Sequence, residues 1–169
     1  TVPAKVKDML AAGVTSFYKT ENGKVSFYDF DTKGYKEVVV SESNISLAAL
    51  RGSGKLVPFA EQFPDQIIEV GIAEQNLVGI AAGLASCGKK VFAVSPASFL
   101  TTRALEHIKN DVCYSDNPVK LVGISAGVSY GALGSTHHSL HDLAALRTIN
   151  NIDIVLPADN FETSECINA

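Results

Sequence analysis

The chain has 169 residues, 46% of them hydrophobic, which is enough apolar material for the core of about one domain. Its 14 basic and 18 acidic residues are spread without runs and give a formal net charge of −4, which argues against a nucleic-acid-binding surface. No apolar run is long enough for a membrane span and no secretory leader is recognisable, so we expect a soluble protein that binds a small ligand.

The three cysteines are odd in number and far apart, and none forms a Cys-x-x-Cys pair. This pattern favours neither a disulfide framework nor a zinc ribbon. A reducing, cytoplasmic location is therefore the expectation.

The first part of the chain has a different character from the rest. Residues 2–12 have the apolar spacing of a short amphipathic helix that ends at Gly13. Residues 16–36 are rich in aromatic side chains and contain Asn22-Gly23, a dipeptide typical of a β-hairpin turn. We therefore predict an N-terminal extension, residues 1–35, followed by a main domain, residues 36–169.

The main domain is predicted to begin with a core strand over residues 37–40 and a polar loop over residues 41–44. The sequence Arg51-Gly52-Ser53-Gly54-Lys55 invites comparison with a phosphate-binding loop. That comparison fails because Ala49 stands where the first glycine belongs and Leu56 follows the lysine. We expect a glycine-rich turn that opens a helix over residues 55–63.

Residues 66–95 predict a strand, a helix and a second strand. Residues 67–72 and 91–94 are short apolar runs without alternation, as in parallel strands that are covered on both faces. At about 100° per residue, the helix between them has an apolar face with Glu74 at its centre, and Gly79 on the opposite, polar side.

The position of Glu74 has two interpretations. A glutamate in the first turn of a helix is stabilised by the helix dipole and needs no other reason. A carboxyl group among apolar side chains, however, must find a partner or stay protonated, because burying an unpaired charge costs several kcal/mol. Glu74 also follows the carboxyl end of a strand, where ligands bind in open α/β sheets.

The pattern of alternating strands and helices continues to the end of the chain. Helices are predicted over residues 98–114 and 140–146 and after Pro157-Ala158-Asp159, and strands over residues 119–124 and 152–156. The predicted fold is α/β, a doubly wound and mostly parallel sheet with helices on both faces. Right-handed crossovers bring the loops after the strands to one edge.

Residues 69–85, Glu-Val-Gly-Ile-Ala-Glu-Gln-Asn-Leu-Val-Gly-Ile-Ala-Ala-Gly-Leu-Ala, closely resemble the pyrimidine-binding domain of the transketolase family of thiamine diphosphate enzymes. The resemblance covers residues 36–165 and is closest to split transketolases, in which this domain belongs to a C-terminal-type subunit. In the family, the domain usually continues beyond the Pro-Ala-Asp sequence. We therefore expect residues 36–169 to be a domain shortened at its C-terminal end, either because the chain is a fragment or because it is a naturally short subunit.

The resemblance implies roles for five residues. Glu74 is the catalytic glutamate that hydrogen-bonds the cofactor's pyrimidine ring and shares a proton with it, Phe99 stacks on that ring, and Arg103 matches an arginine typical of split subunits. His137, at the end of Gly-Val-Ser-Tyr-Gly-Ala-Leu-Gly-Ser-Thr-His, matches a histidine that faces substrate and cofactor, with His138 as its neighbour.

Each of these residues also has a plainer interpretation. Phe99 is compatible with an ordinary core position, and Arg103 with a solvated helix surface. His137, His138 and His141 have the spacing of a metal site, but no thiolate or clear carboxylate partner accompanies them.

The resemblance further implies a partner. The family's metal–diphosphate motif, Gly-Asp-Gly followed at a distance by Asn, is missing from the chain, so the diphosphate and its Mg²⁺ or Ca²⁺ are expected on a diphosphate-binding, N-terminal-type subunit. The implied activity is transfer of a two-carbon ketol unit from a ketose, often a phosphate, to an aldose. Leu133 replaces a usual acidic residue, which puts the usual sugar phosphate donor in doubt.

Three alternatives stay open. The chain is also compatible with the corresponding domain of 1-deoxyxylulose phosphate synthase, with a 2-oxo acid dehydrogenase β subunit, and with a noncatalytic fragment that only pairs with a partner.

Overall fold

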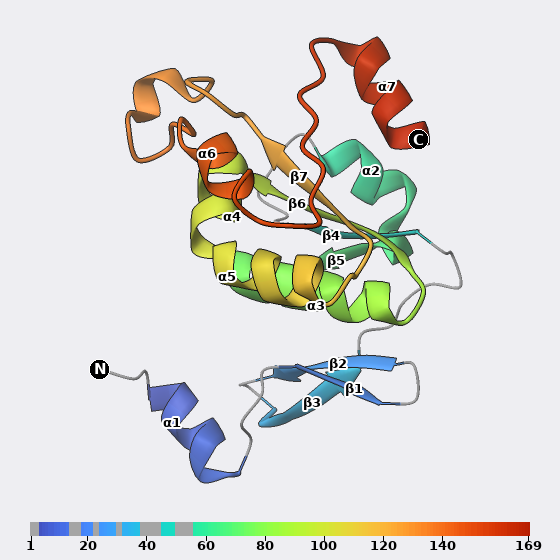
Figure 1. Cartoon of the computed structure of the whole chain (residues 1–169). Coiled ribbons are helices and arrows are strands. Elements are labelled where there is room, and N and C mark those ends of the chain that lie inside the picture. The colour runs from blue at the N-terminus through green and yellow to red at the C-terminus, as the bar shows by residue number, and fades with distance from the viewer. Residues whose placement is uncertain (1–3, 14–17, 22–23, 30–31, 38–44, 50–55) are drawn as a thin grey trace.

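The computed structural model of the protein describes residues 4–13, 18–21, 24–29, 32–37, 45–49 and 56–169. Its first elements are a helix, α1 (Ala4–Ala11), and an antiparallel sheet of β1 (Tyr18–Glu21), β2 (Lys24–Asp29) and β3 (Gly34–Glu37), in the order β1-β2-β3 (Figure 1). Pairing of Glu21 with Lys24 confirms the predicted hairpin, although residues 22–23 themselves lie outside the described residues.

The prediction of a core strand over residues 37–40 was wrong in its first residue. Glu37 ends β3 and pairs antiparallel with Ser26 of β2, so it belongs to the N-terminal sheet. The aromatic-rich segment continues past the hairpin into a third strand, because β2 offers a second edge for pairing. Residues 38–40, the loop 41–44 and the glycine-rich segment 51–55 lie outside the described residues.

The second sheet is parallel and has four described strands, β4 (Ile45–Ala49), β5 (Ile67–Glu69), β6 (Lys90–Pro96) and β7 (Val119–Ile124). Their order is β5-β4-β6-β7, and every neighbouring pair is parallel. The chain therefore moves outward from β4 to β5 and then crosses back over β4 to β6. This reversal creates a topological switch point at the carboxyl ends of β4 and β6, where open α/β sheets bind their ligands.

Helices follow each strand of the parallel sheet. They are α2 (Val57–Gln62), the 3₁₀ turn η2 (Pro64–Gln66), α3 (Glu74–Ser86), α4 (Ala97–Arg103), α5 (Leu105–His107), the π-helical segment η3 (Ile108–Tyr114), the 3₁₀ turn η4 (Gly131–Leu133), α6 (Asp142–Leu146) and α7 (Asn160–Asn168). The helix predicted over residues 98–114 is thus divided at Ala104 and widens into a π-helix, a change that hydrophobic spacing does not encode.

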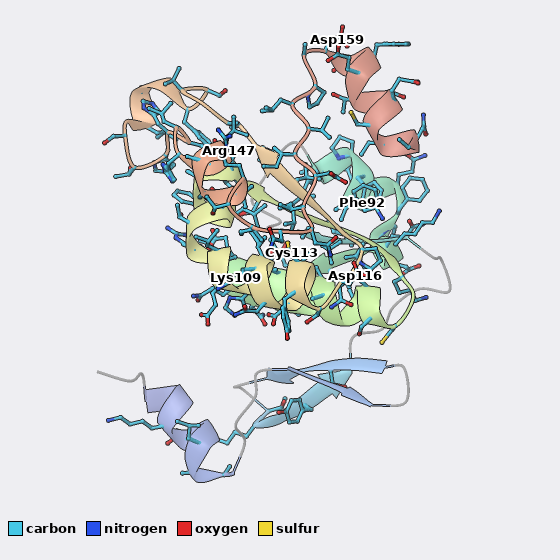
Figure 2. All side chains as sticks on the ribbon, viewed as in Figure 1. Phe92, Lys109, Cys113, Asp116, Arg147 and Asp159 are labelled. Atoms are coloured by element: carbon cyan, nitrogen blue, oxygen red, sulfur yellow. The ribbon has the colours of Figure 1, made fainter. Side chains whose placement is uncertain are left out.

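Side chains of β6 alternate between two apolar layers. Val91 and Ala93 are buried against α3, α4 and η3, whereas Phe92 and Val94 face the layer that contains Phe59 of α2. Figure 2 shows Phe92 on the α2 side of the sheet and Cys113, which belongs to η3, on the other side. The predicted doubly wound α/β fold, with helices on both faces, is confirmed.

Helix α3 is the most buried helix described. Glu74 is 3% exposed and lies on the same helix as Leu77, Ile80 and Leu84, each exposed by 1% or less, which confirms the predicted apolar face around the glutamate. Gly79, predicted on the polar side, is buried as well. Besides the parallel sheet and the neighbouring helices, α3 also contacts β1 and β2, which lie on the side away from that sheet (Figure 1).

The strand predicted over residues 152–156 does not form. This segment pairs with no strand of the described chain, and Val155 and Leu156 are each 62% exposed. An apolar, β-branched run becomes a strand only when a neighbouring edge accepts its hydrogen bonds. The final helix α7 forms as predicted, and the Asp159 side chain caps it by accepting a hydrogen bond from the Glu162 amide. No helix among the described residues is long and apolar enough to cross a bilayer.

Candidate functional site

Two helices and one loop bring the candidate residues to the carboxyl edge of the parallel sheet. Glu74 begins α3 after β5, Phe99 and Arg103 lie on α4 directly after β6, and His137 lies in the loop after β7. Because all strands are parallel, their carboxyl ends meet at this one edge. The site therefore lies beside the switch point between β4 and β6.

The carboxylate of Glu74 is paired with Arg103. Nη1 of Arg103 lies 3.0 Å from Oε1 and 3.1 Å from Oε2 of Glu74. The glutamate side chain is 3% exposed, whereas the arginine side chain is 49% exposed, so the arginine approaches the buried carboxylate from the solvent side. Of the two interpretations of Glu74, the structure supports a buried carboxylate with a specific partner.

Phe99 lies between Arg103 and His137. The central guanidinium carbon of Arg103 is 4.2 Å from the centre of the Phe99 ring, a cation–π distance. The ring of His137 meets Phe99 at 5.2 Å between centroids, with an interplanar angle of 68°. Phe99 and Arg103 are four residues apart on α4 and so share one helix face. Glu74, Arg103, Phe99 and His137 thus form one continuous chain of contacts.

The loop that carries His137 is folded back on itself. Gly127 and Ser139 exchange two backbone hydrogen bonds, of 3.1 and 2.8 Å, which close the loop at its base. Gly127, Gly131 and Gly134 have φ values of 64°, 49° and 77°, a left-handed conformation that favours glycine. These three glycines therefore let the loop turn tightly.

Two neighbours orient the imidazole of His137. The Thr136 hydroxyl lies 3.0 Å from Nδ1 of His137, and the Tyr130 ring meets the imidazole at 5.5 Å between centroids. A hydrogen bond at Nδ1 leaves Nε2 as the nitrogen available to a ligand. Neither Thr136 nor Tyr130 was singled out from the sequence, although both lie in the motif that led to His137.

His138 turns toward the loop backbone. Its Nε2 lies 3.2 Å from the Gly131 carbonyl oxygen, to which it donates when protonated at that position. The described residues contain no group of three or more His, Cys, Asp and Glu side chains close enough to hold a metal ion, so His137, His138 and His141 are not assembled as a metal centre.

The arrangement suits a flat ring that donates hydrogen bonds. Phe99 offers an aromatic face, Glu74 offers two acceptor oxygens shielded from water, and His137 offers a ring nitrogen that can accept or donate a hydrogen bond. The guanidinium group of Arg103 demonstrates the fit, because it is planar, contacts the Phe99 ring and hydrogen-bonds Glu74. An aminopyrimidine has the same combination of a flat face and N–H donors.

Comparisons with known proteins identify the family of the chain. The family model for the transketolase pyrimidine binding domain matches residues 32–169. An apulose-4-phosphate transketolase subunit from Phocaeicola vulgatus is 56% identical over 117 residues, which are 69% of this chain and 38% of that protein. A 1-deoxy-D-xylulose-5-phosphate synthase of Desulfotalea psychrophila is 42% identical over 123 residues, which are 73% of this chain and 19% of that protein.

A solved structure has the same fold. It is described as a split gene transketolase, inactive beta4 tetramer, and it superposes with a TM-score of 0.64 at 36% identity over 74% of this chain and 40% of that one. The chain thus spans about two fifths or less of the length of these relatives. It belongs to the transketolase family, whose cofactor is thiamine diphosphate, and corresponds to the pyrimidine-binding domain of that family.

Proposed function

We propose that this chain is the pyrimidine-binding half of a split, thiamine diphosphate-dependent transketolase. The single observation that supports this most strongly is the buried Glu74 carboxylate beside an aromatic ring at the switch point of the sheet. The similarity to a protein described as an apulose-4-phosphate transketolase subunit points to the same reaction class. The enzyme transfers a two-carbon ketol unit from a ketose, or a ketose phosphate, to an aldose.

Each site residue has a role in this proposal. Glu74 hydrogen-bonds a nitrogen of the pyrimidine ring and shares a proton with it, which its shielding from water favours. Phe99 packs on the ring face, and Arg103, which contacts Phe99 and Glu74 in this structure, lies near the cofactor site. When bound, thiamine diphosphate supplies the nucleophilic carbon that takes up the two-carbon unit.

His137 faces the substrate in this account. Thr136 holds its Nδ1, which leaves Nε2 to bind a substrate oxygen or to move a proton. His138 is the second candidate for substrate contact. Leu133, which is 56% exposed in the same loop, stands where an acidic group is usual, so we propose a donor that does not need a carboxylate at that point.

The diphosphate and its Mg²⁺ or Ca²⁺ are assigned to a partner, a diphosphate-binding subunit of the N-terminal type. The enzyme is then an oligomer, either a hetero-oligomer or one built around a homodimer of this domain. The described cysteines, Cys87, Cys113 and Cys166, are all free thiols, which suits a reducing compartment such as the cytoplasm.

The main alternative is another reaction of the same cofactor. A 1-deoxyxylulose phosphate synthase is favoured by the 42% identity to one such enzyme, and Glu74 would have the same proposed role in it. A 2-oxo acid dehydrogenase β subunit is the second enzyme alternative. A noncatalytic module that only pairs with a partner is the third alternative, and it predicts no cofactor binding under any condition.

Calorimetry with thiamine diphosphate and Mg²⁺ separates these possibilities. We expect the complete protein alone to bind the cofactor weakly and the protein with its diphosphate-binding partner to bind it tightly. Tight, magnesium-dependent binding without the partner would contradict the split site. The assembled enzyme is then incubated with a panel of ketoses and an aldose acceptor. In a separate assay it is incubated with a second pair of substrates, pyruvate and glyceraldehyde 3-phosphate. Ketol transfer supports the transketolase, whereas condensation of the second pair supports the synthase.

A further inference from the structure

The Glu74–Phe99 site is already filled, by a group from the protein itself. Arg103 places its guanidinium carbon 4.2 Å from the Phe99 ring centre while one of its nitrogens hydrogen-bonds both oxygens of Glu74. Within the described part of the chain, Arg103 is the only side chain seen to hydrogen-bond this carboxylate.

We propose that Glu74 and Phe99 form a receptor for flat groups that donate N–H bonds, and that Arg103 occupies this receptor until a ligand ring displaces it. The identity of that ring as the aminopyrimidine of thiamine diphosphate rests on the function proposed above. The occupancy by Arg103 rests only on the contacts of this structure.

The geometry makes such a displacement feasible. Glu74 is held in a helix of the core and is 3% exposed, so it does not move toward a ligand. Arg103 ends α4, its side chain is 49% exposed, and its long flexible stem allows the guanidinium to leave for solvent. The arginine is therefore the mobile member of the pair and the glutamate the fixed one.

Occupancy by Arg103 also explains how the site survives without cofactor. A carboxylate shielded from water is costly when it has no partner, and an arginine stacked on an aromatic ring supplies both charge and hydrogen bonds. The ligand ring takes over the same two functions when it arrives. Its apparent affinity is then lowered by the fraction of molecules in which Arg103 is in place.

The test measures binding of two small probes to the complete, cofactor-free protein with its partner subunit. One probe is 4-amino-5-hydroxymethyl-2-methylpyrimidine, the pyrimidine part of thiamine, and the other is ethylguanidinium, which imitates the arginine head. The variants are Arg103→Ala and, because it retains a cation for Glu74, Arg103→Lys. Arg147→Ala is the matched control, since Arg147 is an exposed arginine outside the site, on the loop after α6 (Figure 2).

We expect Arg103→Ala to bind the aminopyrimidine about tenfold more tightly than the unaltered protein, which corresponds to an open site in roughly one molecule in ten. Arg103→Lys is expected to give a smaller gain, because its ammonium group still pairs with Glu74 although it does not stack on Phe99 as a flat ion. Ethylguanidinium should bind Arg103→Ala and compete with the aminopyrimidine there. Arg147→Ala should match the unaltered protein in both titrations.

Two results separate the inference from the proposed function. If folded Arg103→Ala binds ethylguanidinium but no aminopyrimidine, the arginine is the occupant of a receptor and the pyrimidine function is wrong. If Arg103→Ala and Arg103→Lys bind the aminopyrimidine no more tightly than the unaltered protein, Arg103 does not occupy the site and the inference is overturned. Should Arg103→Ala fail to fold, the Arg103→Lys titration alone decides between these results.

Discussion

Replacing Gly123 with alanine tests the packing that positions the site. Gly123 lies in β7 opposite Ser95 of β6, and a Cβ atom added there would lie 3.1 Å from Cβ and 3.2 Å from Cα of Ala97. Ala97 is 2% exposed and begins α4, the helix that carries Phe99 and Arg103. The new methyl group therefore presses on the start of the helix that forms the site.

The magnitude follows from two opposing effects. Replacing a strand glycine with alanine stabilises a protein by about 0.4–1 kcal/mol when space is available. Inserting a methyl group into a packed site costs about 1–3 kcal/mol. Ala97 yields little, because the Thr101 hydroxyl donates to its carbonyl oxygen at 2.8 Å and its Cα belongs to the helix backbone. We expect a net destabilisation of about 1 kcal/mol, with weaker cofactor binding.

Urea denaturation of the complete protein measures this change, with Gly34→Ala as the matched control. Gly34 is also a strand glycine, but no heavy atom lies within 4 Å of the position of its added Cβ atom, so its replacement should be neutral or stabilising. Combining Gly123→Ala with Ala97→Gly should recover part of the loss, because the overlapping methyl group is removed. The reasoning is refuted if Gly123→Ala is as stable as Gly34→Ala and binds cofactor normally.

Three further predictions concern the rest of the chain. Asp159→Ala removes the acceptor for the Glu162 amide, 2.8 Å away, and should destabilise α7 by about 1 kcal/mol; hydrogen exchange of the α7 amides should accelerate, and unchanged rates would contradict the cap. Burial raises the pKa of the Cys113 thiol, so iodoacetamide should label the exposed Cys166 before Cys113. Labelling of Cys113 in the native protein should need a pH above the ordinary thiol range. Equal labelling rates of Cys113 and Cys166 at about pH 8 would count against the burial of Cys113. Asn151→Ala removes two side-chain hydrogen bonds and places alanine at φ 60°. We expect the free energy of unfolding, measured by thermal denaturation, to fall by about 2 kcal/mol. A fall of less than about a few tenths of a kcal/mol would show that these bonds contribute nothing.

The central strand–helix–strand unit was predictable because its information is local. Helical spacing alone places Glu74 on the apolar face of α3, and the structure buries it to 3% exposure. β7 begins and ends at the predicted residues, because a short apolar run between a proline turn and a glycine-rich loop has one simple interpretation.

What the sequence did not predict depends on contacts between distant segments. β4 is defined by its pairing with β5 and β6, and it was not recognised as a strand. Residues 152–156 have a strand's composition but no partner among the described strands. The Arg103–Glu74 pair joins residues 29 positions apart on two different helices, so helical spacing could not identify Glu74 as the acceptor for Arg103.

The most direct measurement of the central claim is the turnover of Glu74→Gln in the assembled enzyme. Glutamine keeps the size of the side chain and an oxygen for Arg103, so circular dichroism and the urea midpoint should stay close to those of the unaltered protein. The amide does not exchange a proton with a pyrimidine nitrogen, and ketol transfer should fall by at least about a hundredfold, the usual contribution of a positioned acid–base group. A folded Glu74→Gln enzyme that binds cofactor and turns over at a near-normal rate would remove Glu74 from the mechanism.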